Sequence, residues 1–265
     1  MRLKKRDGGR WPHLIESFAI AVSMYSRIPM PKVEWSDSAM RYALCFFPVV
    51  GAAVGAAVTA FSFLADAVGL GALARACIGT ALPLLITGGI HMDGFLDTLD
   101  ARSSLSDRGQ KLEILKDPHT GAFATLGCGV YLLLYAAAFS ELGSRAFPAV
   151  CGIYIMSRAL SAFSVLAFPK VKKEGLARAF ADGAGEKNKV APAALLGWFA
   201  AGAFWLWLFG GAPAAAAVTV TSLAGFAWYY RMAMREFGGI TGDLAGFFLQ
   251  AAELIMLVAL AVTTR

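Results

Sequence analysis

The chain has 265 residues, of which 58% are hydrophobic and 16% are charged, and its formal net charge at pH 7 is +6. Soluble domains are about 45–50% apolar and about 25% charged, so the composition excludes an ordinary soluble domain. The apolar residues fall into blocks of about 20 residues, the length with which a helix crosses about 30 Å of hydrocarbon. We predict one all-α domain, residues 1–265, that crosses a membrane several times.

The first apolar segment, 13–29, follows a basic stretch and superficially resembles a signal peptide. Glu16 interrupts its apolar run, and no A-x-A cleavage site follows it. Arg27 and Pro29 close the segment. This mixture of apolar and charged residues favours a retained helix that lies in the membrane interface rather than one that spans the bilayer.

Seven later blocks are apolar and long enough to span a membrane. They cover residues 42–65, 72–90, 121–141, 147–168, 191–210, 212–230 and 245–263. If the amino terminus is cytoplasmic, the loops 91–120, 169–190 and 231–244 are cytoplasmic too, and these loops hold most of the basic residues outside the amino-terminal stretch. The positive-inside rule accounts for this asymmetry, so the net positive charge does not indicate a nucleic-acid-binding protein.

The segment His91-Met92-Asp93-Gly94-Phe95-Leu96-Asp97-Thr98-Leu99-Asp100 follows the second apolar block directly. In a helix, at about 100° per residue, Asp93, Asp97 and Asp100 share one face, whereas His91 points away from Asp93. Adjacent carboxylates repel one another unless a cation lies between them, and Mg²⁺ binds carboxylates together with substrate phosphates. The segment therefore predicts a Mg²⁺ site for chemistry on a phosphate, and the helical geometry argues against His91 as a ligand or base.

Several charged residues elsewhere suit an anionic substrate. Lys116 and Asp117 lie in the polar loop that follows the acidic segment, where the alternative is an ordinary solvated loop. Arg158 lies near the middle of the fourth predicted span, where a lone arginine needs a carboxylate, a carbonyl or a ligand phosphate. Glu253, inside the last span, is one candidate partner, so phosphate binding and structural pairing are both open. Arg27 either contacts substrate or extends to water at the interface.

A glycine-rich segment, Gly238-Gly239-Ile240-Thr241-Gly242-Asp243, opens the last predicted span. Glycines allow backbone N–H groups to approach an anion, and a helix N-terminus adds the positive end of its dipole. The alternative is a glycine-rich turn in which Thr241 or Asp243 caps the helix. We expect Gly239 and Thr241 to contact substrate phosphates, and Asp243 is a candidate catalytic base.

These motifs, in this order, resemble those of the cobalamin synthase family, the adenosylcobinamide-GDP ribazoletransferases, over nearly the whole chain. The anchors are Arg27-Ile28-Pro29-Met30-Pro31, Phe47-Pro48-Val49-Val50-Gly51, the acidic segment 91–100, Lys116-Asp117 with Gly121-Ala122-Phe123, Gly175-Leu176-Ala177 and the glycine-rich segment 238–243. Two places depart from the family pattern: Asp100-Ala101 stands where Asp-Gly is frequent, and Pro118-His119-Thr120 where Ser-Arg is frequent.

The resemblance implies an enzyme that joins adenosylcobinamide-GDP to α-ribazole, or to its 5′-phosphate, and releases GMP. It implies Mg²⁺ as cofactor and a site at the cytoplasmic face of a bacterial or archaeal membrane. We expect Asp93, Asp97 and Asp100 to hold the metal, and Asp93, Asp97 or Asp243 to act in catalysis. The expected substrate-binding residues are Arg27, Lys116, Asp117, Arg158, Gly239 and Thr241. The oligomeric state is left open.

Two other functions compete with this interpretation. A CDP-alcohol phosphotransferase would follow Asp-Gly with Ala-Arg and then Gly-x₃-Asp-x₃-Asp, but here Asp97 and Asp100 come too early and Gly109 is followed by no such pair. A cation-coupled transporter would use the carboxylates as an ion site near the bilayer midplane. This acidic segment instead begins at the end of a span and continues into a polar loop.

Overall fold

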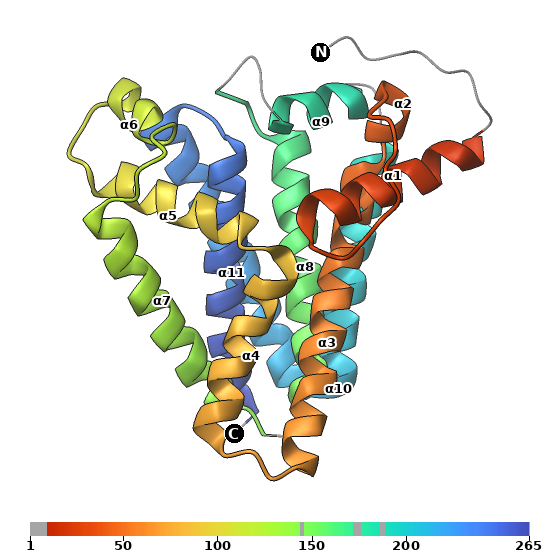
Figure 1. The fold of residues 1–265 in the computed structure, drawn as a ribbon, viewed down its shortest axis with the longest axis vertical. Coiled ribbons are helices and arrows are strands. Elements are labelled where there is room, and N and C mark those ends of the chain that lie inside the picture. The colour runs from red at the N-terminus through yellow and green to blue at the C-terminus, as the bar shows by residue number, and fades with distance from the viewer. Residues whose placement is uncertain (1–9, 144–145, 172–175, 186–188, 265) are drawn as a thin grey trace.

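The computed structural model describes residues 10–143, 146–171, 176–185 and 189–264. Within these ranges every named element is a helix, as Figure 1 shows, which confirms the all-α prediction. The elements are α1 (Arg10–Tyr25), α2 (Asp37–Met40), η1 (Ala43–Phe46), α3 (Phe47–Ala67), α4 (Ala72–Thr87), α5 (Ile90–Ser103), α6 (Arg108–Ile114), α7 (Ala122–Ser140), α8 (Phe147–Ala167), α9 (Leu176–Ala184), α10 (Val190–Met232), η3 (Ala233–Phe237) and α11 (Gly242–Thr263). The anchor Gly175 and the basic residues before Arg10 lie outside the described residues.

Five of the described helical stretches are long and apolar enough to cross a membrane, and the bent pair α4–α5 is a sixth if it counts as one span. They are Asp37–Ala67, Ala122–Ser140, Phe147–Ala167, Val190–Phe237 and Gly242–Thr263. The chain is therefore a polytopic membrane protein. This tally counts the helical element 190–237 once, where two spans, 191–210 and 212–230, were predicted.

That element is broken at Gly211, whose backbone leaves the helical region with φ 82° and ψ 171°. Its two halves follow α8 in opposite directions. Gly202, in the first half, lies against Gly152 near the start of α8, whereas the ring of Phe226, in the second half, is 5.1 Å from the ring of Phe168 just after its end. The glycine break thus folds α10 back on itself, between the two segments that were expected to span separately.

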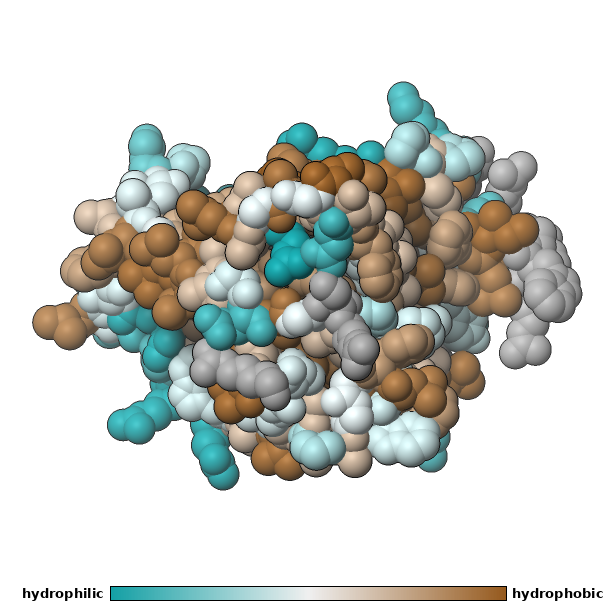
Figure 2. Space-filling model, turned by 90° about the horizontal axis from the view of Figure 1, so that it is seen from below, coloured by the Kyte–Doolittle hydropathy of each residue, from teal (hydrophilic) through white to brown (hydrophobic). Residues whose placement is uncertain are grey.

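Helix α8 occupies the centre of the bundle and packs against α3, α10 and α11. Its approach to α3 depends on small residues, because a Cβ at Gly55 would lie 2.5 Å from the Cα of Cys151. Outward-facing positions on α7 and α10 carry large exposed apolar side chains, among them Leu133 and Trp207. Seen from the end of the bundle that holds the carboxyl terminus, hydrophilic side chains lie near the middle and apolar ones lie around them (Figure 2). The exposed apolar sides of α7 and α10 fit contact with a lipid bilayer.

The turn between α4 and α5 redirects the chain at the other end of the bundle. Gly88 and Gly89 both have positive φ, 68° and 79°, a conformation that favours glycine. They end the second apolar helix at Thr87, and the axis of α5 is bent by 99° from that of α4. Helix α5 consequently runs across the bundle (Figure 1). Its several charged residues are unfavourable in hydrocarbon, so we treat α5 as lying outside the spans.

The three loops predicted to be cytoplasmic meet at this same end. The Arg102 guanidinium lies 3.1 Å from the Glu236 carboxylate, and the Lys111 ammonium lies 3.3 Å from it. An isolated β-bridge joins Lys170 to Ile240. Helix α1, the short apolar helix expected near the amino terminus, packs at this end as well (Figure 1). The side of the membrane that this end faces, and the interfacial position of α1, stay predictions.

Candidate active site

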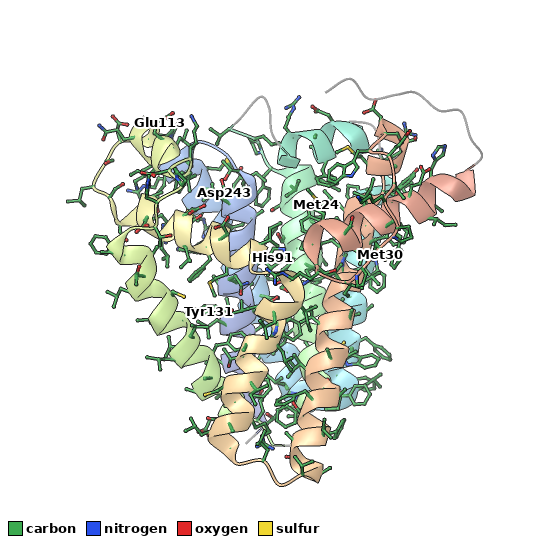
Figure 3. The ribbon with its side chains drawn as sticks, in the orientation of Figure 1. Met24, Met30, His91, Glu113, Tyr131 and Asp243 are labelled. Atoms are coloured by element: carbon green, nitrogen blue, oxygen red, sulfur yellow. The ribbon has the colours of Figure 1, made fainter. Side chains whose placement is uncertain are left out.

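The acidic segment is helical, as expected, and it crosses the first turn of α11. A Cβ at Gly94 would lie 2.7 Å from the Asp243 carbonyl oxygen, and one at Gly246 would lie 3.1 Å from the His91 carbonyl oxygen. The two helices can therefore approach so closely only because both positions are glycine. This crossing places helix α5 against the start of α11, where Asp243 lies (Figure 3).

Three carboxylates converge at this crossing. Asp93 is exposed, Asp97 is half-buried, and Asp243 lies opposite them in the first turn of α11. The pKa of Asp97 is raised to about 6, first by burial and then by repulsion from Asp93, Asp243 and Asp100. The site thus concentrates negative charge that a cation would relieve.

Asp100 has a different environment from the other acidic residues of α5. Its carboxylate accepts hydrogen bonds from the backbone N–H groups of Gly121, at 2.6 Å, and Ala124, at 2.8 Å. These are the N-cap and an early residue of α7, so Asp100 caps that helix from a distance and interacts favourably with its dipole. Both of its oxygens are engaged, and we leave Asp100 out of the proposed metal ligands.

A metal ion would have to be held by few protein groups. Among the described residues, no three His, Cys, Asp or Glu side chains are arranged so that they could hold an ion. Mg²⁺ is usually bound by one or two carboxylates together with waters and substrate phosphates, rather than by a complete protein cage. Asp93 and Asp97, one helical turn apart and beside Asp243, fit that donor set.

A cavity of about 170 Å³ opens beside these carboxylates. Asp93 and Asp243 lie on its wall, and most of the remaining wall is apolar or aromatic. Helices α1, α3, α5, α8 and α11 all contribute to it, together with η1. The lining residues are Met24, Tyr25, Leu44, Phe47, Ile90, His91, Asp93, Gly94, Ser161, Ala162, Val165, Gly242, Asp243, Ala245 and Gly246. The site therefore combines an acidic edge with an apolar interior.

The glycine-rich segment provides this edge of the site with a helix N-terminus. The Thr241 hydroxyl accepts a hydrogen bond from the Leu244 N–H at 3.2 Å, so Thr241 is the N-cap of α11, and it also donates to the Asp243 carboxylate at 3.2 Å. Gly239 packs against the Pro169 carbonyl oxygen, which a Cβ would approach to 2.7 Å. Of this segment, Gly242 and Asp243 reach the cavity.

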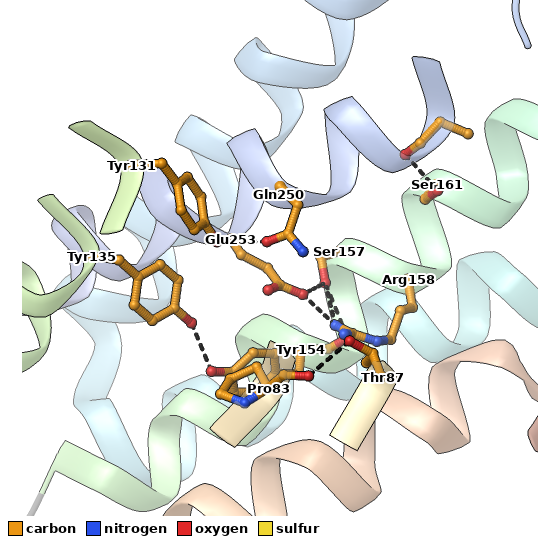
Figure 4. Close-up of polar contacts among 11 residues, drawn as sticks. Pro83, Thr87, Tyr131, Tyr135, Tyr154, Ser157, Arg158, Ser161, Gln250 and Glu253 are labelled. Atoms are coloured by element: carbon orange, nitrogen blue, oxygen red, sulfur yellow. Dashed lines mark hydrogen bonds and ion pairs between the residues drawn. The ribbon is translucent and has the colours of Figure 1, made fainter. Parts of the chain in front are cut away.

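Arg158 is buried and forms an ion pair with Glu253 (Figure 4). The Ser157 hydroxyl also donates to the Glu253 carboxylate at 3.1 Å, and Arg158 donates to the Tyr154 carbonyl oxygen at 3.2 Å. Both charged side chains are only 1% exposed. Of the two possibilities left open by the sequence, the arrangement favours structural pairing over phosphate binding.

The remaining predicted substrate-binding residues lie away from the cavity wall. Lys116 is paired with Glu113 at 2.6 Å in the exposed turn after α6. Asp117, also exposed, accepts hydrogen bonds from the backbone and ring of His119, which lower its pKa. Arg27 is exposed, and its backbone N–H donates to the Ile86 carbonyl oxygen at 2.8 Å, so Arg27 lies against the α4–α5 turn.

Known proteins match this chain over most of its length. A family model described as cobalamin-5-phosphate synthase matches residues 17–261. The chain belongs to the cobalamin-5-phosphate synthase family. Adenosylcobinamide-GDP ribazoletransferase of Lachnoclostridium phytofermentans is 40% identical over 245 residues, 91% of each chain. The proteins of that name from Clostridium perfringens (30%; 88% of this chain and 92% of the relative) and Pseudomonas syringae pv. syringae (32%; 92% and 98%) are also similar. No solved structure matches.

Several residues that line the cavity were not predicted as site residues from the sequence. Met24, Tyr25 and Leu44 are apolar or aromatic residues, and nothing in their sequence context distinguishes a cavity wall from an ordinary core. His91 was set aside because helical geometry turns it from the aspartates. The structure shows that His91 and Asp93 nevertheless line the same cavity, because it wraps around the first turn of α5.

Proposed function

We propose that this chain acts as an adenosylcobinamide-GDP ribazoletransferase, joining adenosylcobinamide-GDP to α-ribazole or its 5′-phosphate with release of GMP. The family match supports this reaction, because the relatives that carry this enzyme name align with the chain over nearly their whole length. The observation that carries the assignment of the site is the crossing at Gly94, which gathers Asp93, Asp97 and Asp243 beside a cavity.

In this reaction a ribose hydroxyl of the acceptor attacks the phosphorus atom that carries cobinamide. A new O–P bond forms, the O–P bond to GMP breaks, and the hydroxyl proton must go to a base. In our proposal Asp243 accepts that proton. It lies on the cavity wall across from Asp93, which is assigned to the metal, so its carboxylate is left to act as the base. Holding both reactants at this edge converts the reaction into an effectively intramolecular one.

Asp93 and Asp97 would hold Mg²⁺, which supplies neutralisation of the negative charge on the diphosphate. The raised pKa of Asp97 supports this assignment, since an ionised carboxylate in that crowd needs a cation. The backbone N–H at the start of α11, beside Gly242, provides a further donor for a phosphate oxygen. Thr241 and Gly239 support that turn, whereas contacts from Arg27, Lys116 or Asp117 to substrate would come from the rim.

The substrate class is tested with purified protein in lipid vesicles, supplied with Mg²⁺ and either of two substrate pairs. With adenosylcobinamide-GDP and α-ribazole we expect GMP release that depends on both compounds. With a CDP-activated lipid and a lipid alcohol we expect no CMP release. Release of CMP without release of GMP would assign the chain to the CDP-alcohol phosphotransferase reaction. Release of neither nucleotide by folded protein would favour the transporter alternative.

We also propose that the α5 end of the bundle faces the cytoplasm of a bacterial cell, because the basic loops gather there. A Lys189→Cys variant places a thiol at that end, at the start of α10. In intact cells we expect no labelling of this thiol by a membrane-impermeant maleimide, and full labelling in inverted vesicles. Labelling in intact cells would reverse the orientation.

A further inference from the structure

The cavity has an interior that the proposed phosphate chemistry does not use. Beyond its acidic edge, the wall is formed by Met24, Tyr25 and Phe47 from the amino-terminal helices and by Ala162 and Val165 from α8. Figure 3 shows Met24 and Asp243 on either side of His91, toward the end of the bundle that carries α5 and α6. An apolar recess next to a charged edge suits a ligand with one apolar and one polar part.

His91 is a buried polar residue of this recess. It is 5% exposed, and its ring lies 5.8 Å from that of Tyr25 and 5.4 Å from that of Phe47, nearly parallel to both. Neither Nδ1 nor Nε2 has a hydrogen-bond partner among the described residues. Buried polar atoms are nearly always paired, and leaving one unpaired is costly. His91 therefore points to a polar atom of a bound ligand.

The size and chemistry of the recess restrict that ligand. A cavity of about 150 Å³ is known to hold benzene, so 170 Å³ suits one or two aromatic rings and excludes a corrin. Guanine presents several donors and acceptors that would each need a partner, whereas the wall away from the acidic edge offers only the His91 ring and the Tyr25 hydroxyl, because Ser161 already donates to the Ala245 carbonyl oxygen. A benzimidazole has apolar rings and, when glycosylated, a single free ring nitrogen that accepts one hydrogen bond.

We propose that this cavity binds the benzimidazole base of the α-ribazole acceptor, with a ring N–H of His91 donating a hydrogen bond to the free ring nitrogen. The proposal rests on the proposed function and adds to it the place of one substrate. With the base in the recess, the attached ribose would reach the edge formed by Asp93 and Asp243, where its hydroxyl must lose a proton. Tyr25 and Phe47 would then hold the His91 ring in place.

The test pairs a change in the protein with a change in the ligand. We compare wild type with His91→Phe, using α-ribazole and an analogue in which CH replaces the free ring nitrogen. Wild type should prefer α-ribazole in kcat/KM by roughly tenfold or more, as expected for one buried hydrogen bond. In His91→Phe the preference should vanish, while KM for adenosylcobinamide-GDP stays within about twofold. His119→Phe, at an exposed position, is the matched control and should keep the preference.

A second measurement separates this proposal from the proposed function. Binding of free dimethylbenzimidazole, without a donor substrate, is followed by its fluorescence in wild type and in Ala162→Leu, which reduces the cavity. Binding by wild type that Ala162→Leu weakens at least tenfold would support the site even if no GMP release were found. Undiminished discrimination in a folded His91→Phe, or unchanged binding in a folded Ala162→Leu, would overturn the proposal.

Discussion

Gly94 lies so close to Asp243 that no side chain fits between them: a Cβ at Gly94 would stand 2.7 Å from the Asp243 carbonyl oxygen and 2.8 Å from its Cα. Helix α5 therefore touches the backbone of the first turn of α11. Asp93 and Asp97 come from one helix and Asp243 from the other, so this contact determines whether the three carboxylates share a site.

The first prediction concerns this contact. Gly94→Ala must separate the two helices, because the opposing atoms are backbone and cannot rotate away. We expect loss of at least roughly a hundredfold in kcat, in line with the effect of about 1 Å misplacement on positioned groups. Gly129→Ala, in helix α7, is the control, since a Cβ there meets nothing within 4 Å. Full activity in a folded Gly94→Ala would show that the crossing does not position the reactive groups.

The second prediction follows from the pKa of Asp97, which is about 6 in the folded chain against an ordinary 3.8. Below the ordinary value Asp97 is protonated in both states and has no effect on stability. Between pH 3.8 and about 6 the unfolded chain ionises Asp97 while the folded chain keeps it protonated, so the destabilisation grows over this range and is complete above pH 6. Without metal, Asp97→Asn should therefore raise the unfolding temperature above pH 6 and leave it unchanged below pH 3.8.

The same unfolding measurement tests the metal site. Above pH 6, adding Mg²⁺ should stabilise wild type and should stabilise Asp97→Asn much less, because one proposed ligand is neutral. Glu34→Gln, at an exposed position, is the control and should respond to Mg²⁺ as wild type does. An equal response to Mg²⁺ in wild type and Asp97→Asn would argue against Asp97 as a ligand.

A third prediction separates a capping role from a ligand role for Asp100. Because its carboxylate accepts the N–H groups of Gly121 and Ala124, Asp100→Ala should lower the free energy of unfolding by about 1–2 kcal/mol. Asp100→Asn keeps one acceptor, so it should lose less stability and retain most of its activity. An Asp100→Asn protein of normal stability but without activity would instead identify Asp100 as a metal ligand.

The fourth prediction concerns the buried ion pair. Arg158→Met leaves the Glu253 carboxylate buried without its partner, and such a change typically costs about 3–5 kcal/mol. Replacing both residues, as in Arg158→Met with Glu253→Leu, should restore part of that loss, as a double-mutant cycle of unfolding free energies would show. A raised KM for adenosylcobinamide-GDP with unchanged stability would assign Arg158 to phosphate binding instead.

The sequence was sufficient for much of the fold because hydrophobic length and helical periodicity are local properties. The helical face shared by Asp93 and Asp97 followed from their spacing, and the break before α5 lies at the predicted end of an apolar block. The two predicted spans 191–210 and 212–230 meet at Gly211, and its non-helical backbone angles turn the chain there, where the two apolar blocks adjoin.

The site was less accessible because its parts are brought together by packing. Asp100 shares the spacing of the other aspartates, but its oxygens face the start of α7, a contact that spacing does not contain. Likewise, Tyr25 and Phe47 meet His91 only after α1, α3 and α5 have packed together. Helical geometry places His91 and the aspartates on different faces of α5, and it gives no sign of the cavity that His91 and Asp93 both line.

The central claim, that the carboxylates at the α5–α11 crossing transfer cobinamide phosphate to an α-ribazole hydroxyl, is tested most directly by GMP release. Wild type, Asp93→Asn, Asp97→Asn, Asp243→Asn and the control Gly129→Ala are assayed in vesicles with adenosylcobinamide-GDP, α-ribazole and Mg²⁺. We predict equal GMP release by wild type and Gly129→Ala, and loss of at least roughly a hundredfold in each aspartate variant. Turnover at the wild-type rate in folded Asp93→Asn and Asp97→Asn would contradict the account.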